Sequence, residues 1–227
     1  MKKPAVTILF LSIALCITGR LSAQTGVGVS IGLNAASLTI SDPSLQHVSP
    51  LAGINASICF TKPLGNSLAF QLGIAWSQHG GLYREETDTP AFKAVEEVTI
   101  RGNYFYLPLT LRYYLEVKEG IMGYALLGGY AAARLNGYVS GHIRGDYSLD
   151  IDVDLENHSA AGDYGAVLGM GIRVPAGKRI LFFEITLARG LANLYRPGDY
   201  LRALDLDAKN NMLMVTAGTD NLFVLPF

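Results

Sequence analysis

Apolar and polar residues alternate with a period of two in many segments of this chain, and this pattern constrains the fold most strongly. Successive side chains of a β-strand point to opposite faces, so each segment would have one apolar and one polar face. Each is about as long as the roughly 9–11 residues with which a tilted strand crosses a bilayer. The clearest segment places on one face Phe105, Leu107, Leu109, Leu111, Tyr113 and Leu115, and on the other Tyr104, Tyr106, Thr110, Arg112, Tyr114 and Glu116.

Eight such strands are expected. The segments with clear alternation cover residues of about 26–40, 54–61, 68–77, 104–116, 163–174 and 181–188. Two less clear segments, of about 121–135, where glycine is frequent, and of about 210–223, are also expected to be strands, but their sequence does not say which face is polar.

The expected connections alternate between short and long. Residues 62–66, 117–120 and 175–178 are rich in turn-forming residues, whereas the connections 41–50, 80–97, 136–162 and 191–209 are longer. Bacterial outer-membrane barrels have short periplasmic turns and long outer loops. The chain is therefore predicted to be an all-β protein, an eight-stranded antiparallel up-and-down transmembrane β-barrel with both termini in the periplasm.

The placement of lysine and of the aromatic residues favours a membrane barrel over a soluble lipocalin-like one. A soluble barrel would carry Lys and Glu on its outer face, but the five lysines after residue 23 all fall in turns, loops or strand ends. Aromatic residues form two expected girdles: Phe60, Phe70, Tyr113 and Phe183 near the turn ends, and Trp76, Phe105 and Tyr164 near the loop ends. After residue 23, no apolar stretch reaches the roughly 20 residues of a membrane helix.

The first 23 residues have the pattern of a cleavable secretory signal peptide: Lys2 and Lys3, an apolar run, and small residues that end at Ala23. A lipoprotein signal around Cys16 is the rival, but bulky Leu15 stands where a small residue is expected. The barrel would then comprise residues 24–227. Its 15 basic residues (18 less three) against 19 acidic ones leave a net charge of −4, which does not suggest nucleic-acid binding. Cys59 remains as a single cysteine, so neither an internal disulfide nor a cysteine-based metal site is expected.

Four segments resemble the PorT-like outer-membrane β-barrel family, the "porin family" proteins common in Bacteroidetes. They are residues 28–34 (GVSIGLN), 72–80 (LGIAWSQHG), 106–114 (YLPLTLRYY) and 163–171 (DYGAVLGMG), and a further Gly-Gly-Tyr stands at 128–130. The resemblance implies an eight-stranded barrel in the outer membrane and no shared catalytic residues. Some relatives serve type IX protein secretion. One departure lies at the C-terminus, where Pro226 cannot donate a ladder hydrogen bond, so the last strand is expected to stop near Phe223.

Four polar residues are expected to lie together in the lumen near its periplasmic end: Arg112, Arg173, Glu184 and Gln71. A buried charge must be paired or it costs several kcal/mol. We therefore expect a structural ion-pair network that fills a narrow barrel, in which Glu184 contacts at least one of the two arginines. The alternative is a proton or ion path.

Two further sets of residues have a plain and a functional interpretation. Alternate carboxylates at Asp150, Asp152, Asp154 and Glu156 would share one face of an extended segment about 6.6–7 Å apart, so a solvated acidic face is favoured over a calcium site. All four histidines, at 47, 79, 142 and 158, fall in expected loops or outer strand ends. Surface histidines are favoured over a catalytic rim.

These patterns predict a non-enzymatic outer-membrane barrel without a cofactor, whose lumen is filled by side chains. A structural, binding or secretion-accessory role at the cell surface is favoured. The alternatives are a narrow channel and an outer-membrane enzyme with a rim active site. The expected partners are outer-membrane lipid, the barrel-assembly machinery, and a secretion or surface partner.

Overall fold

The computed structural model describes residues 25–40, 48–89, 92–145, 148–154, 162–192 and 208–225. Within these ranges the chain forms nine strands: β1 (Thr25–Ile40), β2 (Val48–Pro63), β3 (Leu68–Thr89), β4 (Phe92–Lys118), β5 (Ile121–Gly145), β6 (Ser148–Asp154), β7 (Gly162–Ala176), β8 (Arg179–Gly190) and β9 (Ala208–Leu225). In the part of the chain that the structure describes, no helix is long and apolar enough to cross a membrane.

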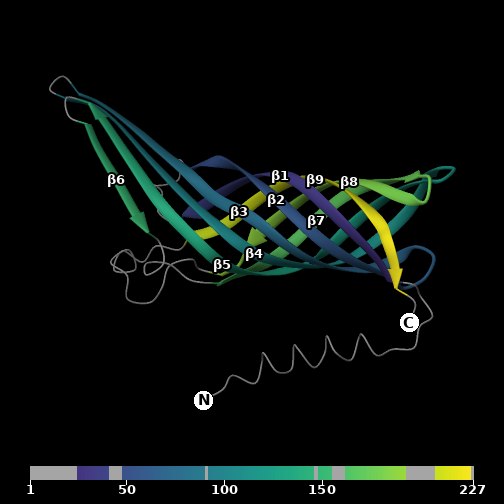
Figure 1. The fold of residues 1–227 in the computed structure, drawn as a ribbon. Helices are drawn as coiled ribbons and strands as arrows, with labels where there is room; N and C mark the ends of the chain where they lie inside the picture. Colours follow the sequence, from purple (N-terminus) through teal and green to yellow (C-terminus); the bar gives the residue numbers. More distant parts are fainter. Residues whose placement is uncertain are drawn as a thin grey trace, which may run out of the picture.

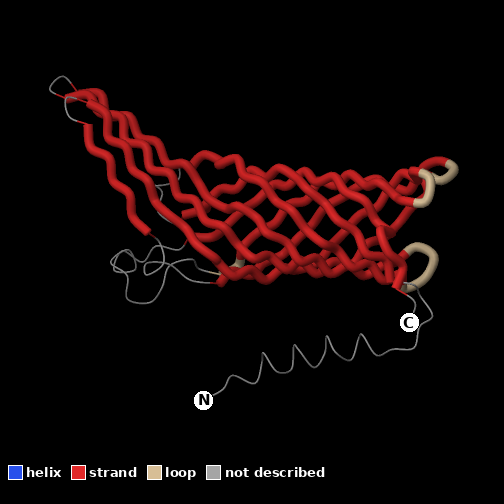
Figure 2. Tube along the Cα trace, in the orientation of Figure 1, coloured by secondary structure: helices blue, strands red, loops and turns tan. Residues whose placement is uncertain are grey.

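Eight of these strands close into a barrel (Figures 1 and 2). The sheet runs β4-β3-β2-β1-β9-β8-β7-β5, and a further pairing of β4 with β5 closes the ring. Neighbouring strands of the ring are antiparallel, and β6 pairs with β5 outside the ring. The predicted eight-stranded antiparallel barrel is confirmed, and each of the eight expected segments lies in a strand of the ring.

The two faces of the barrel wall are those expected from the alternation. Outward-facing Ile31, Leu33 and Met170 are 71%, 67% and 67% exposed, whereas inward-facing Ser77 and Arg112 are 0% and 2% exposed. This orientation exposes aliphatic rows and buries small and polar ones, as a barrel surrounded by hydrocarbon requires. The structure also orients β5 and β9, the two strands whose polar face the sequence did not indicate. Their inward-facing residues include Tyr124, Leu126, Tyr130, Met212 and Met214.

Short turns join β2 to β3, β4 to β5 and β7 to β8, as the sequence predicts. The β4–β5 and β7–β8 hairpins each have a two-residue connection, and glycine occupies a left-handed backbone conformation in both. The φ angle is 76° at Gly120 and 65° at Gly177. Glycine reaches this region without a steric penalty, which lets the strands reverse within two residues.

Two of the expected long loops contain regular strand. β3 continues to Thr89 and β4 starts at Phe92, so the expected loop 80–97 is a long hairpin whose residues 90–91 lie outside the described ranges. The expected loop 136–162 begins with the end of β5 and includes β6. We call the resulting four-stranded projection, residues 81–89, 92–100, 137–145 and 148–154, the outer sheet. It extends beyond the barrel in Figure 1. Most of the expected loops 41–50 and 191–209, at 41–47 and 193–207, lies outside the described residues.

The sequence did not predict the outer sheet, because apolar residues described at its base lie at inward rather than outward positions. In the barrel the outward row of β3 and β4 ends at Trp76 and Phe105, which are paired across the strands. Farther out, the inward positions carry apolar residues such as Ile100 and Val139, which are also paired. Between these levels the side chain of Asn103 donates a 2.7 Å hydrogen bond to Asn136. The strands therefore continue after the lipid-facing row has ended.

The last strand is longer than predicted. β9 extends to Leu225, which pairs with Thr25 of β1, rather than stopping near Phe223. The register shifts between Val27 and Val29 of β1, because β9 contains more residues than β1 between the two flanking pairs. Regular pairing of the two strands then resumes. Pro226 lies outside the described residues, as do the expected signal peptide at 1–23 and residue 24.

Candidate functional site

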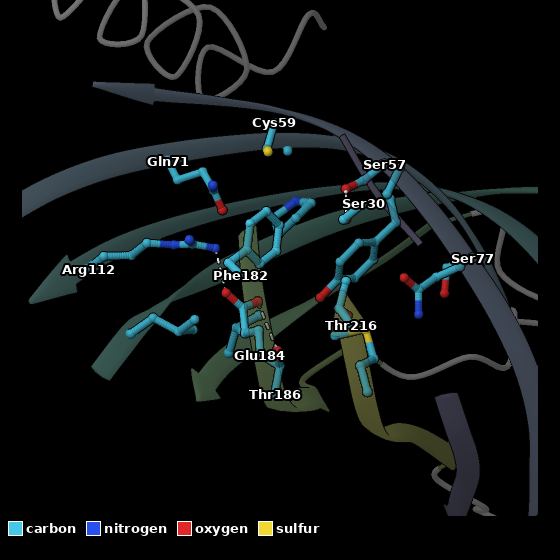
Figure 3. Close-up of a pocket in the computed structure, with 18 residues that line it drawn as sticks. Ser30, Ser57, Cys59, Gln71, Ser77, Arg112, Phe182, Glu184, Thr186 and Thr216 are labelled. Carbon is cyan, nitrogen blue, oxygen red and sulfur yellow. Dashed lines mark hydrogen bonds and ion pairs between the residues drawn. The ribbon is translucent and has the colours of Figure 1, made fainter. Parts of the chain in front are cut away.

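The lumen contains a buried ion pair between two strands that are not neighbours in the barrel (Figure 3). Arg112 of β4 and Glu184 of β8 approach to 2.5 Å, and their side chains are 2% and 13% exposed. Both residues follow the inward parity of their strands, which is why the sequence placed them in the lumen. The expected contact of Glu184 with one of the two arginines is confirmed.

Further groups hold this pair in position. The hydroxyl of Tyr124 donates to Oε2 of Glu184 at 2.9 Å, and that of Thr186 donates to Oε1 at 3.2 Å. The guanidinium of Arg112 lies 4.8 Å from the ring centre of Tyr124 and 5.7 Å from that of Phe182. Ring faces attract cations, so both rings favour the charged arginine.

A second ion pair forms with a residue that the sequence analysis missed. Arg173 of β7 lies 3.0 Å from Asp220 of β9, which is 2% exposed at its side chain. The thiol of Cys59 donates weakly to Asp220 over 3.7 Å, and Arg173 lies 5.0 Å from the ring centre of Tyr114. Asp220 was missed because the inward face of its strand could not be assigned. Asp220 is the one acidic residue of β9, and this was the available signal.

Gln71 lies in the lumen, as expected, but its side-chain hydrogen bond is to another residue. Its amide donates to Thr61 at 3.0 Å, and it lines the cavity beside the Arg112–Glu184 pair (Figure 3). Among the contacts between described residues, Gln71 makes no hydrogen bond to either arginine or to Glu184. The four expected residues therefore contribute one ion pair between two of them, a second pair of Arg173 with Asp220, and a neighbouring amide, rather than one connected network.

The cavity that the Arg112–Glu184 pair lines is small. Its volume is about 70 Å³, and its wall includes Ser30, Asn55 and Thr216. A single water needs about 10–15 Å³, so the space suits a few water molecules. Buried atoms nearby without a hydrogen-bond partner in the described chain include Nδ2 of Asn55 and both Nε and Nη1 of Arg112. The cavity can therefore hydrate buried polar groups but is too small to serve as a wide solute path.

A separate polar cluster lies nearer the end of the lumen from which the outer sheet projects. Asp163, 3% exposed, accepts hydrogen bonds of 2.9 Å from Tyr130 and from Asn210. His79 is also 3% exposed and stacks on Tyr104, with ring centres 4.4 Å apart. The expectation of a surface position is therefore wrong for His79, because the inward parity of β3 continues past Ser77.

The other predicted features occupy the outer wall or the outer sheet. The seven expected interface aromatics all take outward positions, and their exposure reaches 58% at Tyr164 and 56% at Phe183. Asp150, Asp152 and Asp154 occupy alternate positions of β6, as predicted for an extended segment, and Asp150 is paired with His142. Glu156, His47 and His158 lie outside the described residues. Within the described ranges, no three His, Cys, Asp or Glu residues gather in a way that could hold a metal ion.

A glycine makes room for the ring that positions Glu184. A Cβ added at Gly171 would overlap the ring of Tyr124 and lie 2.6 Å from the carbonyl oxygen of Phe183. Overpacking of this kind typically costs about 1–3 kcal/mol. We expect Gly171→Ala to lower the free energy of unfolding by this amount, as measured by urea titration in lipid vesicles.

The matched control is Gly162→Ala, where the nearest atom to an added Cβ is an ordinary 3.6 Å away. This control should leave stability almost unchanged. Equal stability of the two variants would contradict the close packing of Tyr124 against β7.

The comparisons with known proteins agree with the fold. The family model of the outer membrane protein beta-barrel domain matches residues 22–196. No curated protein matches the sequence. Among solved structures, the chain is similar to the attachment invasion locus protein Ail of Yersinia pestis, with 14% identity, a TM-score of 0.36, and coverage of 87% of this chain and 99% of that chain.

Two other solved structures are similar over most of their length. Neisserial surface protein A is 10% identical with a TM-score of 0.40, and the match covers 85% of this chain and 95% of that chain. The outer membrane protease OmpT from Escherichia coli is 11% identical with a TM-score of 0.37, and the match covers 91% and 100%.

Proposed function

Starting from the premise that this chain belongs to the outer membrane protein beta-barrel domain family and is an outer-membrane β-barrel protein, we propose that it acts there without enzymatic activity. Side chains close the lumen of its barrel, and the protein has a structural, binding or secretion-accessory role at the cell surface. The observation that carries this proposal is the filled lumen, where the Arg112–Glu184 pair joins β4 to β8 beside a cavity of only about 70 Å³.

The filled lumen argues against solute transport on physical grounds. Removing a charge from a buried pair leaves its partner uncompensated, so the pair resists being opened. Tyr124 and Thr186 also bond Glu184, and Phe182 packs against Arg112. A passing solute would have to displace all of these groups. A narrow channel is therefore the less favoured function.

The outer sheet supports the binding part of the proposal. It projects beyond the barrel, and among the described strands β6 pairs on one edge only, with β5. Such an edge presents backbone groups to which a partner can add a strand. The pairing places Glu97 beside His142, and Arg84 beside Glu97, on one face of this sheet. A secretion or surface partner would bind there.

The proposal also covers the orientation of the barrel in the membrane, its subgroup within the family and its delivery to the membrane. We place both termini and the three short turns in the periplasm, because outer-membrane barrels turn tightly on that side. The outer sheet then lies outside the cell. The motifs at 72–80 and 106–114 support membership of the PorT-like group. A cleaved signal peptide and the barrel-assembly machinery would deliver the chain to its membrane.

The burial of His79 supports a non-enzymatic role. His79 is buried between aromatic rings and has no hydrogen-bond partner among the described residues. A general base needs a partner within about 2.6–3.2 Å and access to substrate. His79 has neither a hydrogen-bond partner among the described residues nor an exposed position at the rim.

The purified barrel is expected to show no current steps in a planar lipid bilayer, because side chains close its lumen. A wide diffusion porin inserted under the same conditions serves as the positive control. Insertion of the test protein is checked by its heat-dependent mobility on gels. Reproducible single-channel steps that vanish on protease treatment of the bilayer would contradict a closed lumen and favour the narrow channel.

A further inference from the structure

A row of polar side chains crosses the outer wall of the barrel where the lipid-facing row of these strands ends. Ser37 of β1 is paired with Asn211 of β9, which is paired with Arg189 of β8. Arg189 is exposed and continues the outward row of Leu181, Phe183, Ile185 and Leu187. An arginine on this face must reach the membrane interface, because burying its charge in hydrocarbon is costly.

Directly below this row lies a groove on the outer wall. Its volume is about 470 Å³, and its apolar lining comes from neighbouring strands: Ala35, Leu127, Leu168, Leu187 and Leu213. The leucines stand out, being 43% to 63% exposed, while Ala35 and Ala166 leave room between them. Arg189, Asn211 and Ser37 line the polar end of the same groove.

A second cation reinforces that polar end. Lys209 lies two residues before Asn211 in β9, on the same outward face, and is paired with Thr39. Diagonal neighbours across paired strands are about 7–8 Å apart, so Lys209 lies near Arg189. The side chain of Asn211 donates to Thr39 at 2.5 Å, which links the polar groups of the row.

The positive charge of this row is not balanced within the described part of the chain. Neither Arg189 nor Lys209 has an ion-pair partner among the described residues. The groove has no acidic side chain among its lining residues. Two cations with hydroxyl and amide donors above an apolar groove form an amphipathic site with a net positive end.

We propose that this groove binds a phosphorylated lipid of the outer leaflet, with acyl chains along the leucines and a phosphate held by Arg189 and Lys209. Guanidinium groups bind phosphate through paired, charge-assisted hydrogen bonds, and ammonium groups bind it as a point charge. A neutral lipid without a phosphate would fill the apolar groove but leave both cations without a counter-charge.

The test compares affinities of the detergent-purified barrel for lipid A that carries two phosphates and for lipid A from which both have been removed. Native mass spectrometry measures the bound fraction. The double variant R189Q/K209Q is expected to bind the phosphorylated lipid about 30-fold more weakly, which corresponds to about 2 kcal/mol for two cations. Wild-type protein should bind the dephosphorylated lipid with a similar loss, a comparison that depends on no variant.

The matched control is K178Q/R179Q, which removes two exposed cations at the opposite end of β8. It should change the affinity less than about threefold, because its charges lie outside the proposed site. Equal weakening by both double variants would reduce the effect to net charge and overturn the site. Equal binding of both lipids, displacement by excess inorganic phosphate alone, or a lipid-independent dimer that covers the groove would also overturn it.

Discussion

Glu184→Gln is expected to lower the free energy of unfolding by about 3–5 kcal/mol, the usual cost of removing one partner of a buried ion pair. Arg112 is 2% exposed, and its only charged partner among the described residues is Glu184. The substitution keeps the size of the side chain, so the loss reports charge rather than packing. Without the carboxylate, the guanidinium stays buried with a neutral amide as its nearest partner.

Urea titration in lipid vesicles measures this loss, with the fluorescence of Trp76 as the signal, since the chain has a single tryptophan. The control is Glu119→Gln, in the exposed β4–β5 turn, where a change below about 0.5 kcal/mol is expected. The double variant Arg112→Met with Glu184→Leu should be more stable than Glu184→Gln, because an apolar pair leaves no buried charge. If Glu184→Gln matched the control, the ion pair would not contribute to the stability of the barrel.

Ile185→Arg is expected to cost about 2–4 kcal/mol, the penalty for arginine on the lipid face near the middle of the bilayer. Ile185 is 52% exposed and lies midway along the outward row of β8. On a soluble barrel the same substitution would place a charge in water at almost no cost. The size of the effect therefore measures whether this face contacts hydrocarbon.

Leu64→Arg provides the comparison, since Leu64 is 47% exposed in the β2–β3 turn rather than on a strand. Its expected change is below about 0.5 kcal/mol, because this turn lies outside the hydrocarbon. Both variants are titrated with urea in the same vesicles. A stable Ile185→Arg protein that stays in solution without detergent would refute the assignment of the aliphatic rows to lipid.

The two faces of β4 show why so much of the barrel was predictable. Tyr104, Tyr106 and Arg112 are buried, and Leu111 and Leu115 are exposed, as their alternation predicts. Inward or outward orientation in a strand follows from position parity alone, so local sequence determines it. The short turns were equally local, because glycine at 120 and 177 meets a conformational need within two residues.

Other features depended on residues far apart in the chain. Arg173 was predicted to lie in the lumen, but its partner Asp220 could not be named. Both faces of β9 carry apolar residues, such as Met214 and Val215, so its inward face could not be recognised. The Asp163 cluster likewise joins Tyr130 and Asn210 from two other strands. Such contacts depend on the pairing register of the closed ring, which no single segment encodes.

The outer sheet also shows what local sequence patterns predict and what only the tertiary structure reveals. Alternation continues through residues 97–100, but the apolar Val98 and Ile100 take inward positions there. By itself, the sequence determined the strands of the ring, their lipid-facing rows and their tight turns, because these follow from parity and local backbone preferences. Only the tertiary structure decided the ion-pair partners, the burial of His79 and the reach of the outer sheet, because closure of the barrel brings distant strands into register.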